Sequence, residues 1–309
     1  MTNSADPSTT ESVAYQRPTT WMRLSSNVSV LIGGWVLSVL VILAIAAPVL
    51  GTVDPILFDA TNRDLLPGEQ GEITDIDGHT TQRTFWLGAD SYGRDIYSRV
   101  LYGARVSLMV GIAVSIIGLS IGLFCGLIAG YFRALDGFVM RVMDGLMAIP
   151  GILLAIALVA LWKATIVVVV VAIAIPEIPR VTRLVRSLVL TIREEPYVEA
   201  AISLGTGRLA ILYRHILPNC MAPLIVQGTY VCASAILVEA ILSFLGVGLP
   251  TDIPTWGNIM AEGRVQFTQF PHNVLFPGIL LALTVLAVNM LGDGLRDTLD
   301  PRFAKRTGL

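Results

Sequence analysis

The chain has 309 residues, of which 54% are hydrophobic and 14% are charged, and its formal net charge is −2. Its mean hydropathy is +0.71. This composition excludes an ordinary soluble globule, in which about 25% of the residues are charged, and it indicates an integral membrane protein. The near-balanced charge also argues against the basic stripe typical of nucleic-acid binding, so no nucleic-acid partner is expected. The lipid bilayer is the expected surroundings of the chain.

Residues 1–27 begin with a stretch rich in Ser, Thr and Pro, which is typical of a disordered tail. Residues 28–50 are the first candidate span, because a spanning helix needs about 20 mostly apolar residues. The triplet at 44–46 resembles a signal-peptidase site, which leaves cleavage of this segment as an alternative. A span is favoured, since the uncharged run over 24–53 exceeds the apolar run of about 7–15 residues in a signal sequence.

Five further apolar segments have the length of spans, so that six transmembrane helices are expected in an all-α polytopic membrane protein. They cover residues 106–130, 145–162, 164–179, 223–246 and 274–292. Lys163 splits an almost continuous apolar stretch, and we interpret Trp162-Lys163 as an interfacial anchor between two helices. The alternative is one long tilted helix, which would reverse the orientation of everything downstream.

The distribution of positive charge predicts the orientation. With six spans and both termini in the cytoplasm, most of the 21 Lys and Arg residues lie on the cytoplasmic side, as the positive-inside rule requires. The expected organisation has a periplasmic segment at 51–105, a five-helix core at 106–292 with a cytoplasmic loop at 180–219, and a cytoplasmic tail at 293–309. Within the periplasmic segment, the polar stretch 54–84 predicts a small hairpin around Asp77-Gly78.

Four glycines recur at intervals of four in the second span. They are Gly118, Gly122, Gly126 and Gly130. This spacing lines one helix face with hydrogen atoms, so that a neighbouring helix can approach closely. Helix packing is therefore favoured over a role in a substrate path.

A charge-rich amphipathic helix that enters the membrane is expected over 90–105. Its charged residues are spaced for mutual pairing. They are Asp90, Arg94, Asp95 and Arg99, with Gly93 between them. The simpler interpretation is a structural helix at the membrane interface, because exposed ion pairs contribute little energy. The functional interpretation is that this helix forms part of a surface on which another protein docks.

Glu239 is an ionisable residue deep in the apolar segment 223–246. An acid there costs about 2.5–3.5 kcal/mol on insertion scales, so its side chain is expected to face the bundle interior or a wet cavity. It is a candidate for a translocation path, and an interhelical hydrogen bond is the structural alternative. A proton-coupled secondary transporter with Glu239 as its relay is a rival function, although the inverted repeats typical of such proteins are not seen.

Several catalytic motifs are absent from the sequence. Neither of its two lysines, Lys163 and Lys305, follows a glycine, so the chain has no phosphate loop of the Walker type and is not expected to hydrolyse ATP itself. The three histidines and three cysteines lack metal-ligand spacing, and no metal or cofactor is expected. No serine lies in a nucleophile elbow, so an enzyme acting alone is not expected.

The polar segment between the fourth and fifth expected spans is the strongest functional signal. Glu194-Glu195-Pro196 predicts a helix start, because acids and proline are favoured in a first turn, and Gly205 and Gly207 predict its end. A second short helix is expected over 208–217, ending before the next proline. The product is an exposed docking surface, here called the elbow (residues 194–218). For Glu199 alone, the alternative is an interaction with its own helix dipole.

The elbow resembles the EAA loop of bacterial ABC importer permeases. The matching residues are Glu199-Ala200-Ala201, Gly205 and His215-Ile216-Leu217-Pro218. His215 stands where the general pattern has an apolar residue, a departure similar to the peptide-permease branch. Further likeness to that branch lies in Leu87-Gly88-Ala89-Asp90, Gly93-Arg94-Asp95, Leu242-Ser243-Phe244-Leu245-Gly246, Trp256-Gly257 and Gly292-Asp293-Gly294-Leu295-Arg296-Asp297. The likeness covers about residues 20–305 and identifies a C-type permease subunit of the dipeptide, oligopeptide and nickel ABC importers.

This resemblance implies the type I importer permease fold in a bacterial inner membrane. It also implies a homologous B-type permease as heterodimer partner, two cytoplasmic ABC ATPase subunits and a periplasmic solute-binding protein. Di- or oligopeptides are the indicated cargo, with nickel, glutathione, opine or sugar as alternatives. The resemblance also implies which residues couple the permease to the ATPase: Glu199, Ala200, Ala201, Gly205, His215, Leu217 and Pro218. A membrane receptor or scaffold is a further alternative function, but such a protein has no ATPase partner to act on the elbow.

Overall fold

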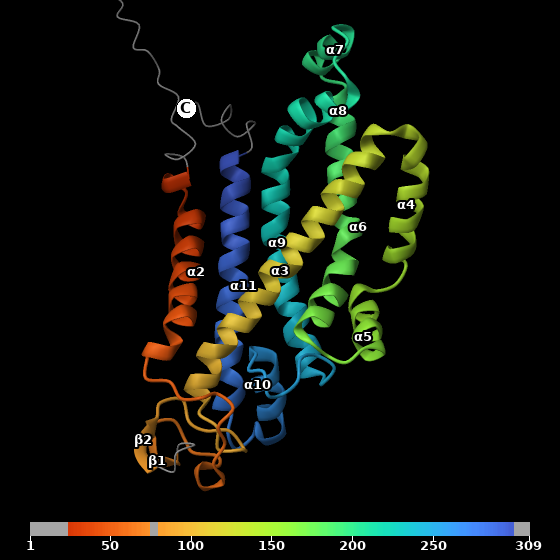
Figure 1. The fold of residues 1–309 in the computed structure, drawn as a ribbon. Coiled ribbons are helices and arrows are strands. Elements are labelled where there is room, and N and C mark those ends of the chain that lie inside the picture. The colour runs from red at the N-terminus through yellow and green to blue at the C-terminus, as the bar shows by residue number, and fades with distance from the viewer. Residues whose placement is uncertain (1–23, 75–79, 300–309) are drawn as a thin grey trace, which may run out of the picture.

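The computed structural model describes residues 24–74 and 80–299, which form a bundle of long helices with a small sheet at one end (Figure 1). Its α-helices are α2 (Val28–Ala46), α3 (Ile96–Tyr131), α4 (Arg133–Met147), α5 (Gly151–Leu161), α6 (Ile166–Arg193), α7 (Pro196–Ser203), α8 (Arg208–Ile211), α9 (Leu217–Phe244), α10 (Trp256–Gly263) and α11 (His272–Leu299). Short turns are η1 (Ala47–Val49), η2 (Ala60–Asn62), η4 (Arg264–Gln266) and the π-helical η3 (Leu212–Ile216).

The sheet consists of β1 (Glu69–Thr74) and β2 (Thr80–Phe85), which pair antiparallel with Glu69 opposite Phe85. It lies within the polar stretch 54–84, where a hairpin was expected, and Phe85 is buried in a small core of its own. The expected turn at Asp77-Gly78 falls outside the described residues. The fold is therefore mostly helical, and the expectation of an all-α chain is corrected by this hairpin.

Four helical stretches are long and apolar enough to cross a membrane. They are Val28–Val49, Ile96–Tyr131, Arg208–Phe244 and His272–Leu299. α4 and α5 add a fifth only if they are counted together across their 84° bend, so by length and composition the described part of the chain has four or five such spans, and the expected six are not confirmed. The expected span at 145–162 is wrong because the helix breaks before Pro150, which lacks an N–H and disfavours helical geometry in the residue before it.

α6 extends further than the sequence predicted. The expected break at Lys163 is confirmed, since α5 ends at Leu161 and α6 begins at Ile166. The expected end at residue 179 is wrong, because α6 continues to Arg193 and takes in residues that were assigned to the cytoplasmic loop. Two prolines lie inside α6, which membrane helices tolerate when neighbouring helices satisfy the freed backbone groups.

α3 and α6 pack along the glycine face of α3, and we call this contact the α3–α6 seam. Each glycine lies against one residue of α6: Gly118 against Glu177, Gly122 against Val181, Gly126 against Val185 and Gly130 against Val189. A Cβ added at the last three glycines would lie 2.5–2.6 Å from a valine Cβ. Only glycine permits this approach, which buries all three valines.

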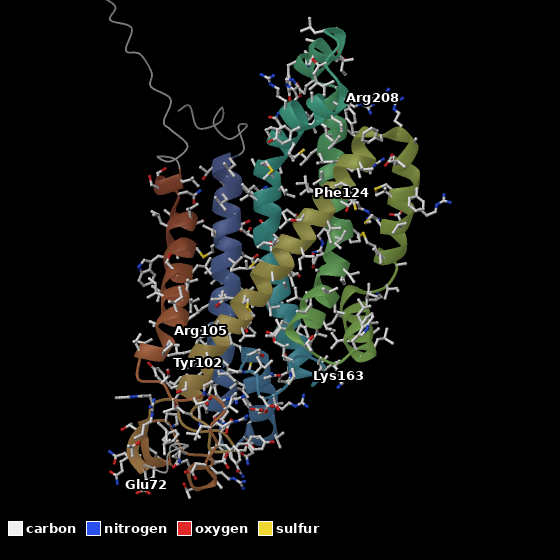
Figure 2. All side chains as sticks on the ribbon, in the orientation of Figure 1. Glu72, Tyr102, Arg105, Phe124, Lys163 and Arg208 are labelled. Carbon is white, nitrogen blue, oxygen red and sulfur yellow. The ribbon has the colours of Figure 1, made fainter. Side chains whose placement is uncertain are left out.

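The two ends of the bundle differ (Figure 1). The sheet and α10 lie at one end, the hairpin end. Trp256 of α10 donates a hydrogen bond from Nε1 to the carbonyl oxygen of Val100 on α3 at 3.2 Å. At the other, the elbow end, α7 and α8 project beyond the long helices. Figure 2 places Glu72 at the hairpin end and Arg208 at the elbow end, so the polar excursions of the chain are separated by the length of the bundle.

Candidate functional site

The first arm of the elbow is α7, and its ends are set by local sequence. α7 begins at Pro196 with Glu195 as N-cap, which confirms the predicted start. It ends before Leu204, and Gly205 follows with φ +79°, a conformation that favours glycine. The N–H of Thr206 then bonds to the carbonyl oxygen of Ala201 at 3.1 Å, which closes the helix in the manner of a Schellman motif.

The second arm differs from the prediction. α8 is followed directly by the π-helical turn η3 and then by α9, so the helix does not end before Pro218 but takes that proline into its next turn. A proline inside a helix clashes with the carbonyl four residues earlier, here that of Arg214, and the wider π turn accommodates it. The second arm is therefore the beginning of a continuous rod over Arg208–Phe244.

The elbow is anchored from within and apolar on its outside. Val198 and Ile216 are fully buried in the main core. Leu204 is 86% exposed, and Leu209 and Tyr213 are also exposed. Large exposed apolar side chains are typical of a surface that interacts with another protein or with a membrane.

The predicted coupling residues all lie in the elbow, on different sides of it. Glu199, Ala200, Gly205 and Pro218 are exposed, His215 and Leu217 are partly buried, and Ala201 is buried. Glu199 lines an open cavity of about 620 Å³ with Arg133, Arg193 and Arg208, among others. The Glu199 carboxylate thus lies at the edge of a cavity, lined in part by arginines, between the elbow and the start of α4.

At the hairpin end, the predicted charged residues form a buried network. Asp90 to Asp95 form a turn and not the first half of a helix, because Gly93 has φ +76° and α3 starts only at Ile96. Asp95 caps α3 by accepting a hydrogen bond from the N–H of Ser98 at 3.2 Å. The expected helix over 90–105 is therefore wrong for its first six residues.

The pairing itself was predicted, but its environment and one partner were not. Arg94 Nε donates to Asp90 Oδ2 at 2.7 Å, and both Arg94 and Arg99 contact Glu262 of α10, with Arg99 Nη2 at 3.2 Å from Glu262 Oε2. Arg99 is fully buried, so these are not the exposed ion pairs that were expected. Burial raises the pKa of the Glu262 carboxyl, and the Arg99 and Arg94 charges oppose that rise.

Glu239 is fully buried between α3 and α9. Its carboxylate accepts hydrogen bonds from Ser243 Oγ at 2.8 Å and from Ser107 Oγ at 3.3 Å. This is the geometry of an interhelical hydrogen bond, the structural alternative for this residue.

Sequence reasoning missed a second buried acid. Glu177 of α6 accepts hydrogen bonds from Arg180 Nη1 at 3.0 Å and from Ser234 Oγ of α9 at 3.1 Å. The sequence signal for Glu177 is an acid between two prolines at the end of an apolar run. This position was interpreted as the end of a membrane span, so the acid itself was overlooked. No group of three side chains that could hold a metal ion occurs within the described ranges.

Two family models match the chain. The binding-protein-dependent transport system inner membrane component matches residues 118–305, and the N-terminal TM domain of oligopeptide transport permease C matches residues 18–67. The probable peptide ABC transporter permease protein y4tQ of Sinorhizobium fredii is 50% identical over 277 residues, which are 90% of this chain and 90% of that protein.

The dipeptide transport system permease protein DppC of Alkalihalophilus pseudofirmus is 39% identical over 281 residues, 91% of this chain and 88% of that protein. Among solved structures, the MetNI methionine ABC transporter in an inward-facing conformation has a TM-score of 0.53 and 18% sequence identity. That match covers 65% of this chain and 96% of the other. At this identity the likeness bears on the fold alone, and the fold is that of an ABC transporter.

Proposed function

Since the chain belongs to the family of binding-protein-dependent transport system inner membrane components, we propose that it is the permease subunit of an ATP-driven peptide importer. The observation that carries this proposal is that relatives matching about nine tenths of the chain are named permeases for peptides or dipeptides. In this proposal the chain pairs with a homologous B-type permease, and the two form the path for di- or oligopeptides across a bacterial inner membrane.

The ATPase docks on the elbow. The exposed apolar side chains of the elbow, among them Leu204 and Leu209, form the kind of surface that a partner protein covers. The sequence has no phosphate loop, so ATP must be hydrolysed by separate subunits. Glu199 stands beside three arginines at this surface, where it can orient the partner as well as stabilise α7.

The elbow end faces the cytoplasm and the hairpin end faces the periplasm. Arg193, Arg208 and Arg214 cluster in and beside the elbow, as the positive-inside rule requires of a cytoplasmic loop. The periplasmic binding protein then docks at the hairpin end, where the buried ion network holds α10 against the start of α3. The two partners act on opposite ends of one bundle.

Coupling follows from the continuity of the second arm with α9. When ATP binding closes the ATPase dimer, the elbow moves with it, and a helical rod without a loop passes that movement to the membrane core. The nucleotide must bind one conformation of the assembly better than the other, since otherwise it shifts no equilibrium.

Variants of the elbow test this function. Glu199→Lys and Gly205→Glu should leave membrane abundance and assembly intact but uncouple peptide uptake from ATP hydrolysis in proteoliposomes that contain the complete importer. Gly137→Glu is the matched control, because Gly137 is exposed on α4 and a Cβ there meets nothing within 4 Å. Normal uptake by the elbow variants at wild-type abundance would refute the coupling role.

The energy source is tested separately, in vesicles loaded with ATP. Vanadate should abolish uptake, and collapse of the proton gradient should leave it unchanged. The reverse result would favour a secondary transporter with Glu239 as its proton relay. The burial of that carboxylate and its hydrogen bonds to Ser107 and Ser243 argue against such a relay.

A further inference from the structure

The ion pair of Glu177 and Arg180 lies at the middle of the bundle. Glu177 faces Gly118 of α3 and bonds to Ser234 of α9. Gly118 is the midpoint of the apolar segment 106–130, and Ser234 is close to the midpoint of 223–246. Two neighbouring helices therefore place the pair independently near the centre of the membrane.

The two side chains of the pair differ in exposure. The Glu177 side chain is 9% exposed, whereas that of Arg180 is 59% exposed. Glu177 is the acid that pairs with Arg180 within the described parts of the chain. A guanidinium at the centre of a bilayer is expensive and therefore faces water or protein and not lipid. The exposed side of Arg180 thus marks a polar surface in the assembled transporter.

On the elbow side of Arg180, the α6–α9 boundary opens into a cavity of about 610 Å³, which Leu184 lines one turn along α6. Its lining is mostly apolar, but α9 contributes Gln227 and Tyr230 to it and α11 contributes Arg296. Tyr230 is one turn from Ser234, which bonds to Glu177, so polar side chains of α9 connect the ion pair with this cavity.

Resting on the proposed function, we propose that Arg180 binds a carboxylate of the transported peptide at mid-membrane and that the α6–α9 boundary lines the path. An arginine has five N–H donors, and its contact with Glu177 through Nη1 leaves the others for a ligand. Planar guanidinium and carboxylate groups form paired, charge-assisted hydrogen bonds. Glu177 is a positioning residue, because it is itself held by Ser234 and keeps the arginine at one depth.

Uptake by the complete importer tests this proposal. Arg180→Gln should lower peptide uptake at subsaturating concentration by at least about tenfold, the loss of a hydrogen bond to a charged group, while Arg180→Lys should retain part of it. Arg183→Gln is the matched control, because Arg183 is an exposed arginine one turn away that pairs with an exposed acid, Asp144, at 2.6 Å.

Assembly of the importer should be unchanged in all three variants. Uptake by Arg180→Gln at the wild-type rate would overturn the proposal. A loss of subunit assembly in parallel with uptake would overturn it as well, since Arg180 would then be pairing with an acid of the partner permease.

Thiol labelling gives a second measure, which is the accessibility of position 180 to water. In a chain whose three native cysteines are replaced by alanine, Arg180→Cys should react with a membrane-impermeant anionic methanethiosulfonate, and peptide supplied during turnover should slow the reaction. Phe124→Cys is the control, because Phe124 is 65% exposed but lies on an apolar face of α3 (Figure 2). If wild-type uptake is sensitive to vanadate but Arg180→Cys does not react, the proposal fails and the importer function stands.

Discussion

Gly126→Ala probes the α3–α6 seam. The new Cβ would lie 2.6 Å from the Cβ of Val185 and 2.8 Å from the carbonyl oxygen of Thr182. Ordinary van der Waals contact begins at 3.4 Å, so the two helices must separate by 3.4 − 2.6 = 0.8 Å at this point. Both neighbours belong to regular α-helix, so neither can move away as the free end of a flexible side chain does.

The cost has two parts. Overpacking of a close contact costs about 1–3 kcal/mol. A gap of about 0.5–1 Å at the neighbouring glycines also forfeits a quarter to a half of each dispersion contact there. Alanine regains about 1 kcal/mol of helix propensity over glycine, so the net destabilisation should be about 1–2 kcal/mol. This corresponds to a factor of about 5–30 in the folding equilibrium.

Thermal unfolding of the purified protein in detergent measures the effect, with Gly34→Ala as control. Gly34 is also a glycine in an expected membrane helix, but a Cβ there meets nothing within 4 Å, so its alanine variant should be neutral or slightly more stable. Adding Val185→Gly to Gly126→Ala should recover about 1 kcal/mol relative to additivity. Equal stability of the two alanine variants, or strict additivity of the double variant, would refute the packing argument.

Two buried carboxylates give the remaining predictions. Glu262→Gln should lower the free energy of unfolding by about 3 kcal/mol, because it removes one of the two acids that compensate the buried charges of Arg94 and Arg99 and leaves Asp90 to face both. Arg83→Gln should cost about 1 kcal/mol or less, because the Arg83 side chain is partly exposed and Asp95 keeps its hydrogen bond from Ser98. Equal melting temperatures of the two variants would contradict this. Glu239→Gln should retain uptake near the wild-type rate, because the amide oxygen can accept from one serine hydroxyl while the amide NH2 donates to the other. Glu239→Leu should lower the melting temperature by leaving those hydroxyls unpaired. Loss of uptake in Glu239→Gln at wild-type stability would show a role for the charge.

Features with a local cause were predictable from the sequence. The start of α7 at Pro196 and its end before Gly205 depend on backbone chemistry within a few residues. The break at Lys163 has a similar local signal, a charge between two apolar runs. The glycine spacing of α3 predicted a close helix contact because its period matches one helix face. The first arm of the elbow was therefore predicted correctly, whereas its second arm continues through Pro218 into α9.

Features that depend on distant residues were not predictable in this way. Glu262 lies more than 160 residues after Arg99, and nothing near either residue indicates their contact. Hydropathy averages over a window, so it joined α4 and α5 across a bend and ended α6 at its first charges. The pair of Glu177 and Arg180 was missed for the same reason, because its position in the membrane becomes evident only from its contacts with α3 and α9.

The α3–α6 seam also bears on how the chain enters the membrane during synthesis. α6 carries Glu177, Arg180 and Arg183, and each charge near a helix centre opposes insertion by about 2.5–3.5 kcal/mol. α6 accordingly is not among the described helices that are apolar enough to span alone. α3 leaves the ribosome first, and its glycine face offers the nascent α6 a surface that lipid does not. We therefore expect the glycines to serve insertion into the membrane as well as the mature fold, because their close contact lets a charged helix follow an apolar one into the bilayer.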